Sequence, residues 1–148
     1  MTLSLASIDD RVAVSGQLQP SDMSEVARAG YVAVVNNRPD REAMFGQPRT
    51  SELREAAEKA GLAFLDLPFS GANLQPEHVR AFLGLLGERD GKVLAFCKSG
   101  MRSALLWGVA AMVRGRAREE VLDAARKAGQ NLDQAGERMA ALVAQVRS

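Results

Sequence analysis

Residues 93–103 read VLAFCKSGMRS, and the rest of the sequence is organised around this stretch. Its first four residues are apolar, as expected for a strand that is buried on both faces of a parallel sheet. From Ser103 to Val113 the chain carries no charge and has the character of a buried helix. The pattern therefore predicts a strand that delivers Cys97 at its carboxyl end, a tight turn that contains Gly100, and a helix behind the turn.

This turn has the residue types of an anion-binding loop. A turn that leads into a helix directs several backbone N–H groups into one concavity, and the helix dipole adds positive potential there. The same field favours the thiolate form of Cys97, which makes the sulfur a nucleophile. Arg102 supplies a planar cation, and Ser103 supplies a hydroxyl that could cap the helix or donate to the sulfur. We predict Cys97 and Arg102 as catalytic residues, in an anion-binding loop made of Lys98, Ser99, Gly100, Met101 and Ser103.

The alternative for Cys97 is an inert core thiol, because free cysteine is among the most buried residue types. The next residues argue against this alternative. Lys98, Ser99, Gly100 and Arg102 are poor core formers, and a buried inert thiol needs neither two cations nor a glycine turn beside it. We therefore expect Cys97 to be functional.

Strand patterns and helix patterns alternate along the rest of the chain. The apolar run at 31–35 is typical of a central strand, 63–67 has the pattern of a further parallel strand, and 11–16 alternates enough to form a first strand. These patterns predict a three-layer α/β fold with a mostly parallel, four-stranded sheet and helices on both faces. We expect one domain over 1–148, with a core at about 8–114 and C-terminal helices within 116–147. Helical patterns occupy 21–30, 51–61, 76–86, 103–113, 118–128 and 132–146.

Polar residues follow two of the other predicted strands, at the sheet edge where open α/β sheets bind their ligands. Arg38 and Asp40 come after the strand at 31–35, and they either face the cysteine loop or pair with each other and brace a long connection. Asp66 lies at the end of the next strand, where a structural carboxylate is the favoured interpretation. His78 stands in the first turn of a helix and is expected to be exposed, without a part in catalysis. Trp107 is expected in the core.

Length and composition limit the function classes. The 148 residues are 47% hydrophobic, which fits a full core, and the formal charge of +1 argues against a nucleic-acid partner. Cys97 is the single cysteine, so an intrachain disulfide and a multi-cysteine metal site are excluded, and we predict no metal and no cofactor. No uncharged run reaches the ~17–25 residues of a membrane helix. We therefore expect a cytoplasmic protein without membrane contact, whose last helix could serve a homodimer.

The cysteine loop resembles the active loops of rhodanese-type sulfurtransferases and of cysteine-dependent phosphatases. The phosphatase signature has five residues between Cys and Arg, whereas Cys97 and Arg102 are separated by four, as in the shorter rhodanese-like span. The wider chain is similar to the bacterial family of beta-lactamase-hydrolase-like proteins with a phosphatase-like domain, over about 8–114. This similarity implies a dual-specificity-phosphatase-like or rhodanese-related fold. It rests on the cysteine loop and on Ser15-Gly16-Gln17, Asn36-Asn37-Arg38-Pro39-Asp40 and Leu67-Pro68-Phe69.

The same resemblance suggests where a general acid should be. In the phosphatases, the loop that corresponds to 68–73 carries an aspartic acid that protonates the leaving group, but no acid occurs from Leu67 to Gln75. Without a general acid, a phosphatase could forfeit roughly 10²–10⁴ in rate.

We therefore predict a sulfurtransferase, in which the Cys97 thiolate takes the outer sulfur of thiosulfate or of a low-molecular-weight persulfide and a thiol acceptor then receives it. The first alternative is a protein tyrosine or dual-specificity-like phosphatase that forms a phosphocysteine. The second alternative is a module that binds an anion or a phosphate group without turnover.

Overall fold

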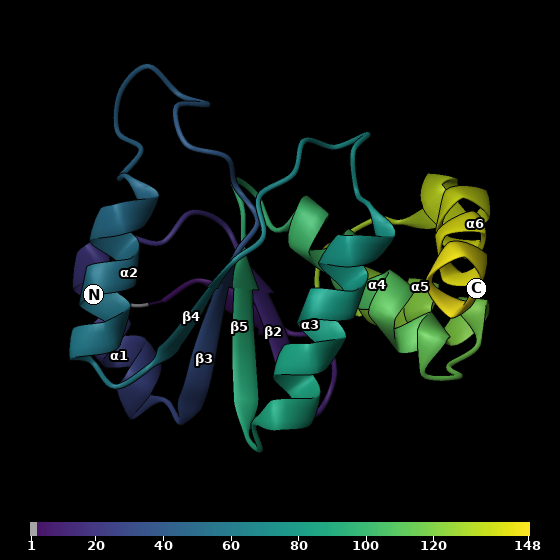
Figure 1. Ribbon diagram of the computed structural model, residues 1–148, viewed down its shortest axis with the longest axis horizontal. Helices are drawn as coiled ribbons and strands as arrows, with labels where there is room; N and C mark the ends of the chain where they lie inside the picture. Colours follow the sequence, from purple (N-terminus) through teal and green to yellow (C-terminus); the bar gives the residue numbers. More distant parts are fainter. Residues whose placement is uncertain (1–2) are drawn as a thin grey trace.

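The computed structural model describes residues 3–148, and its sheet has five strands in the order β1-β2-β5-β3-β4. The strands β2, β5, β3 and β4 run parallel, whereas β1 pairs antiparallel with β2. The parallel strands therefore end at one edge of the sheet, at the top of Figure 1. The strands are β1 (Leu5–Ser7), β2 (Val12–Ser15), β3 (Tyr31–Asn36), β4 (Ala63–Asp66) and β5 (Lys92–Phe96).

Helices cover both faces of this sheet (Figure 1). The helices α1 (Met23–Arg28) and α2 (Thr50–Lys59) lie on one face, and α3 (Pro76–Glu88) and α4 (Met101–Val113) lie on the other. Beyond α4 lie α5 (Arg118–Lys127) and α6 (Gly136–Arg147), so the second side is two helices deep. Short 3-10 turns at Pro20–Asp22 and Asp133–Ala135 precede α1 and α6.

The apolar run of β5 is buried because the strand lies in the middle of the sheet with helices on both faces. Val93 and Ala95 pack into the cluster on the α3–α4 side, and Leu94 and Phe96 pack into the cluster on the α1–α2 side. All four are 0% exposed. Such a strand has no polar face, which explains its unbroken apolar sequence.

The helix α4 is enclosed in the same way, by the sheet, α3, α5 and α6. Its residues from Ser103 to Ala111 are buried, and Trp107 is only 1% exposed, as expected for a core residue. The indole Nε1 of Trp107 donates to Asp9 Oδ2 at 2.7 Å, which satisfies its one polar group. A helix that is buried all round needs no charged face, and this accounts for the uncharged run of the sequence.

The fold differs from the sequence-based prediction in three details. The sheet has a fifth strand, β1, whose three residues are too few to show a periodic pattern. The helix α4 begins at Met101, two residues earlier than predicted, and Gly100 is its N-cap. The helix expected from Ser21 begins only at Met23, because Ser21 lies inside the preceding 3-10 turn, where Asp22 accepts the Gln19 N–H at 2.7 Å.

Between residues 3 and 148, none of the helices is both long and apolar enough to cross a lipid bilayer.

Candidate active site

The sulfur of Cys97 lies at the end of β5, beneath the first turn of α4. Cys97 is 1% exposed, and its N–H donates to the carbonyl of Ser15 at the end of the neighbouring β2, at 3.3 Å. The N–H of Gly100 donates to Cys97 Sγ at 3.1 Å. The turn therefore curls back over the sulfur and directs a backbone N–H group at it, an arrangement that stabilises negative charge on sulfur.

Gly100 permits this turn because its backbone is left-handed, with φ of 96°. A side chain here would be strained, and a Cβ would also lie 2.6 Å from Gln130 Nε2. Gln130 follows α5 and donates through Nε2 to the carbonyl of Ser99 at 3.1 Å. The C-terminal part of the chain thus braces the cysteine loop, a contribution that the sequence did not indicate.

The other side of the loop rests on the segment that follows β2. The N–H of Gln17 donates to the carbonyl of Lys98 at 3.3 Å. A Cβ on Gly16 would lie only 2.9 Å from the same oxygen, so only glycine allows the two backbones this close approach. Lys98 and Ser99 are exposed on the surface of the loop, and Met101 is 39% exposed. The loop is therefore held by its backbone on both sides, while its side chains face outward.

Arg102 is held by a carboxylate that the sequence analysis did not select. Its Nη1 donates to Glu42 Oε2 at 2.6 Å and its Nη2 donates to Glu42 Oε1 at 2.9 Å, a bidentate pair that fixes the plane of the guanidinium. A further bond runs from Nη1 to the carbonyl of Phe69 at 3.2 Å. These bonds engage the Nη end of the guanidinium and leave the Nε edge for a ligand.

Arg38 shares this carboxylate. Its Nε donates to Glu42 Oε1 at 2.9 Å, and its Nη1 donates to Gln17 Oε1 at 2.9 Å. Arg38 is 5% exposed and therefore lies in the interior, beside the residues that carry the cysteine loop. Arg38 and Asp40 do not form the pair that was considered as an alternative.

The two arginines that contact Glu42 lower the pKa of its carboxyl group strongly. Hydrogen bonds from Arg102, supported by those from Arg38 and opposed by burial, lower the pKa of Glu42 from 4.5 to about 2. The bond to Glu42 in turn raises the pKa of Arg102 above its ordinary value, and the Cys97 sulfur adds a smaller upward contribution. Glu42 is therefore ionised at neutral pH and has no proton to give.

Ser103 has a different partner from the two that were expected. Its Oγ donates to Asn37 Oδ1 at 2.8 Å and neither caps α4 nor bonds to the sulfur. Asn37 in turn donates through Nδ2 to the carbonyl of Leu67 at 3.0 Å and through its backbone N–H to the carbonyl of Phe96 at 2.8 Å. Asn37 is 0% exposed and ties α4 to β5 and to the end of β4.

Asp40 and Asp66 take structural positions. Asp40 Oδ1 accepts the N–H and the hydroxyl of Thr50, each at 2.9 Å, and so supports the first turn of α2. Asp66 Oδ1 accepts a bond from Asn36 Nδ2 at 2.9 Å, between neighbouring strands. Neither carboxylate has Arg102 as a partner.

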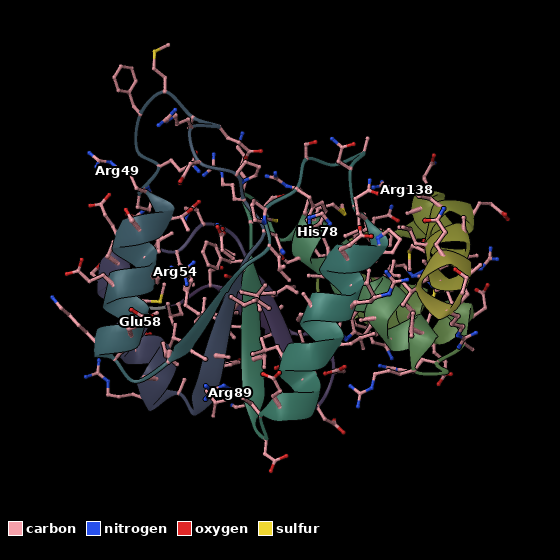
Figure 2. The ribbon with its side chains drawn as sticks, in the orientation of Figure 1. Arg49, Arg54, Glu58, His78, Arg89 and Arg138 are labelled. Atoms are coloured by element: carbon pink, nitrogen blue, oxygen red, sulfur yellow. The ribbon has the colours of Figure 1, made fainter. Side chains whose placement is uncertain are left out.

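His78 braces the loop after β4, and Figure 2 labels it at the end of the molecule where the loops lie. Its Nδ1 accepts the N–H of Gln75 at 3.0 Å, and its Nε2 lies 3.2 Å from the carbonyl of Pro68. The ring also packs against Phe69, with 5.4 Å between the ring centroids. These contacts fix the loop whose Phe69 carbonyl receives Arg102.

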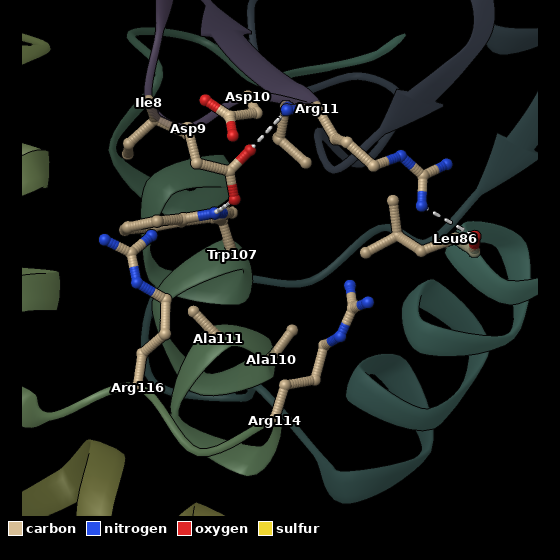
Figure 3. A pocket seen from close by; sticks show the side chains of 11 residues that line it. Ile8, Asp9, Asp10, Arg11, Leu86, Trp107, Ala110, Ala111, Arg114 and Arg116 are labelled. Carbon is tan, nitrogen blue, oxygen red and sulfur yellow. Dashed lines mark hydrogen bonds between the residues drawn. The ribbon is translucent and has the colours of Figure 1, made fainter. Parts of the chain in front are cut away.

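A cavity of about 520 Å³ lies away from the cysteine, at the opposite edge of the sheet and beside the end of α4 (Figure 3). Two of its charged side chains, Asp9 and Arg11, make hydrogen bonds within the fold, and Arg116 lies over the Trp107 ring. Asp9 accepts from Trp107 and from the backbone of Arg11, and the Arg11 guanidinium donates to the carbonyl of Leu86 at 2.8 Å. This cavity is separate from the candidate active site, since its walls hold neither Cys97 nor Arg102.

Comparison with known proteins places this site in a family. The family described as beta-lactamase hydrolase-like protein, phosphatase-like domain, matches residues 4–114. The chain belongs to this family. A beta-lactamase hydrolase-like protein of Xylella fastidiosa strain Temecula1 is 32% identical over 122 residues, which are 82% of this chain and 28% of the relative. The chain thus spans only 28% of the length of that curated relative.

Solved structures agree with this family in their fold. A candidate phosphatase from Neisseria meningitidis Z2491 matches with a TM-score of 0.83 and 31% identity, over 95% of this chain and 99% of that one. The active form of Tk-PTP matches with a TM-score of 0.74 and 28% identity, over 97% of each chain. The fold is therefore the three-layer α/β fold of cysteine-based phosphatases, as the resemblance in the sequence implied.

Proposed function

We propose that this chain is a cysteine-dependent phosphomonoesterase. The observation that carries the proposal is the pairing of a buried cysteine sulfur, which accepts a backbone N–H, with an arginine that Glu42 holds in a fixed plane five residues further along the chain. A guanidinium fixed in this way presents its remaining N–H groups as a rigid fork, which matches the oxygens of a phosphoryl group. The family and the phosphatase-like neighbours support the same activity.

In the proposed reaction the Cys97 thiolate attacks phosphorus. An S–P bond forms, the P–O bond to the leaving group breaks, and the leaving oxygen takes away the electron pair. Loop N–H groups and Arg102 bind the phosphoryl oxygens as charge develops on them. Water then attacks the phosphocysteine, the S–P bond breaks, inorganic phosphate leaves, and the thiolate is regenerated.

Among the residues that the structure describes, the site lacks an acid that could protonate the leaving group, and this limits which substrates can react. The loop from Leu67 to Gln75 carries no carboxylic acid, and Glu42 is ionised because Arg102 holds its pKa at about 2. We therefore expect a strong dependence on the leaving group: acidic phenols depart as anions, whereas alkoxides need a proton.

The predicted sulfur transfer is not supported by the comparisons, which favour the phosphatase alternative. That prediction gave weight to the four-residue span between Cys97 and Arg102 and to the missing acid. Both features are present in the chain, but likeness to phosphatase-like structures over 95% of its length outweighs one residue of loop length.

The test is steady-state hydrolysis of p-nitrophenyl phosphate by the wild type, Cys97→Ser and Arg102→Lys. We expect turnover by the wild type, none by Cys97→Ser, and a loss of roughly 10²-fold in kcat/KM for Arg102→Lys, because an ammonium cannot replace the fork. Tungstate should still bind to Cys97→Ser. Equal activity in wild type and Arg102→Lys would remove Arg102 from the site, and tungstate binding without any turnover would favour the anion-binding module.

A further inference from the structure

A second cavity, of about 370 Å³, opens directly beside Arg102. The first turn of α4 provides Met101 and Arg102, and the next turn provides Leu105. Opposite them, the segment 131–138 provides Leu132 and Arg138. This volume is in the range of small-molecule sites, which is roughly 300–1,000 Å³. The cavity thus adjoins the proposed phosphoryl site at Arg102, which belongs to both.

The walls of this cavity are mainly apolar. Leu105 and Leu132 are 5% and 3% exposed and are fixed in the core, whereas Met101 is 39% exposed. Such walls suit a flat hydrocarbon group, and the polar side chains Asn131 and Gln134 also line the cavity. An aryl leaving group also meets the condition set by the missing acid, because a phenolate leaves more readily than an alkoxide.

Arg138 adds one charge at the rim. It lies on α6, and its Nη2 donates to the carbonyl of Gly71 in the loop after β4, which connects the two sides of the cavity. A guanidinium has five N–H donors, so this one bond leaves most of them for a ligand. Figure 2 shows Arg138 at the end of the molecule where the loops lie, and Arg89 at the opposite end.

We propose that this cavity binds the leaving group of a phosphomonoester that carries an aryl group and a second negative charge, with Arg138 as the residue that selects that charge. The inference rests on the proposed phosphatase activity and adds a substrate class to it. The segment 131–138 lies outside residues 4–114, which match the family, whereas the other wall of the cavity, with Met101, Arg102 and Leu105, lies within them.

The test compares two substrates that differ in one negative charge and one methyl group, 4-(carboxymethyl)phenyl phosphate and its methyl ester. We expect the wild type to prefer the acid by about tenfold in kcat/KM, the value of one hydrogen bond between charged groups. Arg138→Glu should abolish this preference, measured as the ratio of kcat/KM for the two compounds. Arg138→Gln, which removes the positive charge without adding a negative one, should also lose the preference. The matched control is Arg89→Glu, the same charge change at the far end of the molecule, which should keep the wild-type ratio.

A third variant tests the apolar part of the cavity. Ala135 also lines the cavity. Ala135→Phe fills the space, so it should lower kcat/KM for both aryl phosphates about tenfold or more while tungstate affinity stays unchanged. An unchanged ratio in Arg138→Glu, or unchanged aryl turnover in Ala135→Phe, would overturn the proposal.

Failure of the phosphatase activity itself gives a different result. In that case the wild type would hydrolyse neither aryl phosphate. Calorimetric binding of the two compounds to Cys97→Ser would then show whether the cavity binds the charged group. A tighter acid, with the preference lost in Arg138→Glu, would support the subsite, and equal affinities would refute it.

Discussion

At the scale of single residues, Glu42 determines how Arg102 is presented. Its two oxygens bind the Nη atoms of Arg102, and Oε1 also accepts a bond from Arg38. Neither arginine is free to rotate while Glu42 is charged. We therefore regard Glu42 as a positioning residue, which acts on a bound anion only through Arg102.

Glu42→Gln should impair catalysis and also change the pH dependence of stability. An amide can accept only one of the bonds from Arg102, so we expect kcat/KM for p-nitrophenyl phosphate to fall roughly ten- to hundredfold. In the folded wild type the pKa of Glu42 is about 2, below its ordinary 4.5, so its ion pairs stabilise the fold above pH 4.5. This contribution is lost as the pH falls from 4.5 toward 2.

Urea unfolding at several values of pH between 5 and 2.5 measures this second effect. The free energy of unfolding of Glu42→Gln should fall less steeply with decreasing pH than that of the wild type. The control is Glu58→Gln, an exposed glutamate on α2, which should follow the wild-type curve. Identical slopes for wild type and Glu42→Gln would show that the carboxylate is not held by the two arginines.

Residues within the loop could be predicted from the sequence, and their partners could not. Cys97, Gly100 and Arg102 lie within six positions of one another, so a local pattern of strand, turn and helix brings them together. Glu42 lies 60 positions before Arg102, in a loop with several other charged residues, and only the fold shows which of them reaches the guanidinium. Asn37 was noted as part of a motif, but its bond to Ser103 depends on the order of the strands.

At the scale of elements, α4 has a left-handed glycine at each end, and the two have different surroundings. Gly100 has φ of 96° and Gly115 has φ of 101°. A Cβ on Gly115 would meet no atom within 4 Å, whereas a Cβ on Gly100 would lie 2.6 Å from Gln130 Nε2. Alanine substitutions at the two glycines therefore separate the free-energy cost of the left-handed backbone from the cost of disturbing the cysteine loop.

Gly115→Ala should lower the free energy of unfolding by about 1–2 kcal/mol and leave activity unchanged, because it strains only the backbone. Gly100→Ala should cost about 1 kcal/mol more, since it also displaces Gln130 from the carbonyl of Ser99, and it should lower kcat/KM. Gln130→Ala should destabilise less in the Gly100→Ala background than alone. Urea unfolding and kinetics of these three variants and of the double variant Gly100→Ala, Gln130→Ala measure this. Strictly additive changes in the free energy of unfolding would mean that Gln130 does not brace the loop.

The elements themselves were predictable where their patterns are long or strongly apolar. The strands β3 and β5 and the buried character of α4 follow from continuous apolar runs, because elements enclosed on all sides have no polar face. The strand β2 was predictable from its alternating pattern. The strand β1 escaped prediction because its three residues gain their hydrogen bonds only from β2. The support of α2 could not be predicted for a related reason, because Asp40, which accepts the Thr50 N–H, lies ten positions earlier in the chain.

At the scale of the whole molecule, the site depends on segments from the entire chain. The cysteine loop rests on the segment after β2 on one side and on Gln130 on the other, and the cavity beside Arg102 is closed by residues of the 131–138 segment. The C-terminal helices were predicted as packing elements or as a surface for a dimer. Their contacts with the loop give them a further role, in the shape of the site, which no local pattern near Cys97 could reveal.

The most direct test of the central claim is the mass of the covalent species on Cys97. The wild type is mixed for milliseconds with p-nitrophenyl phosphate or with thiosulfate, quenched in acid, digested and analysed by mass spectrometry. We predict a phosphoryl group on the peptide that contains Cys97 after p-nitrophenyl phosphate, and its absence from Cys97→Ser. A single added sulfur atom on that peptide after thiosulfate, with no phosphoryl adduct from the ester, would contradict the phosphatase assignment and restore sulfur transfer.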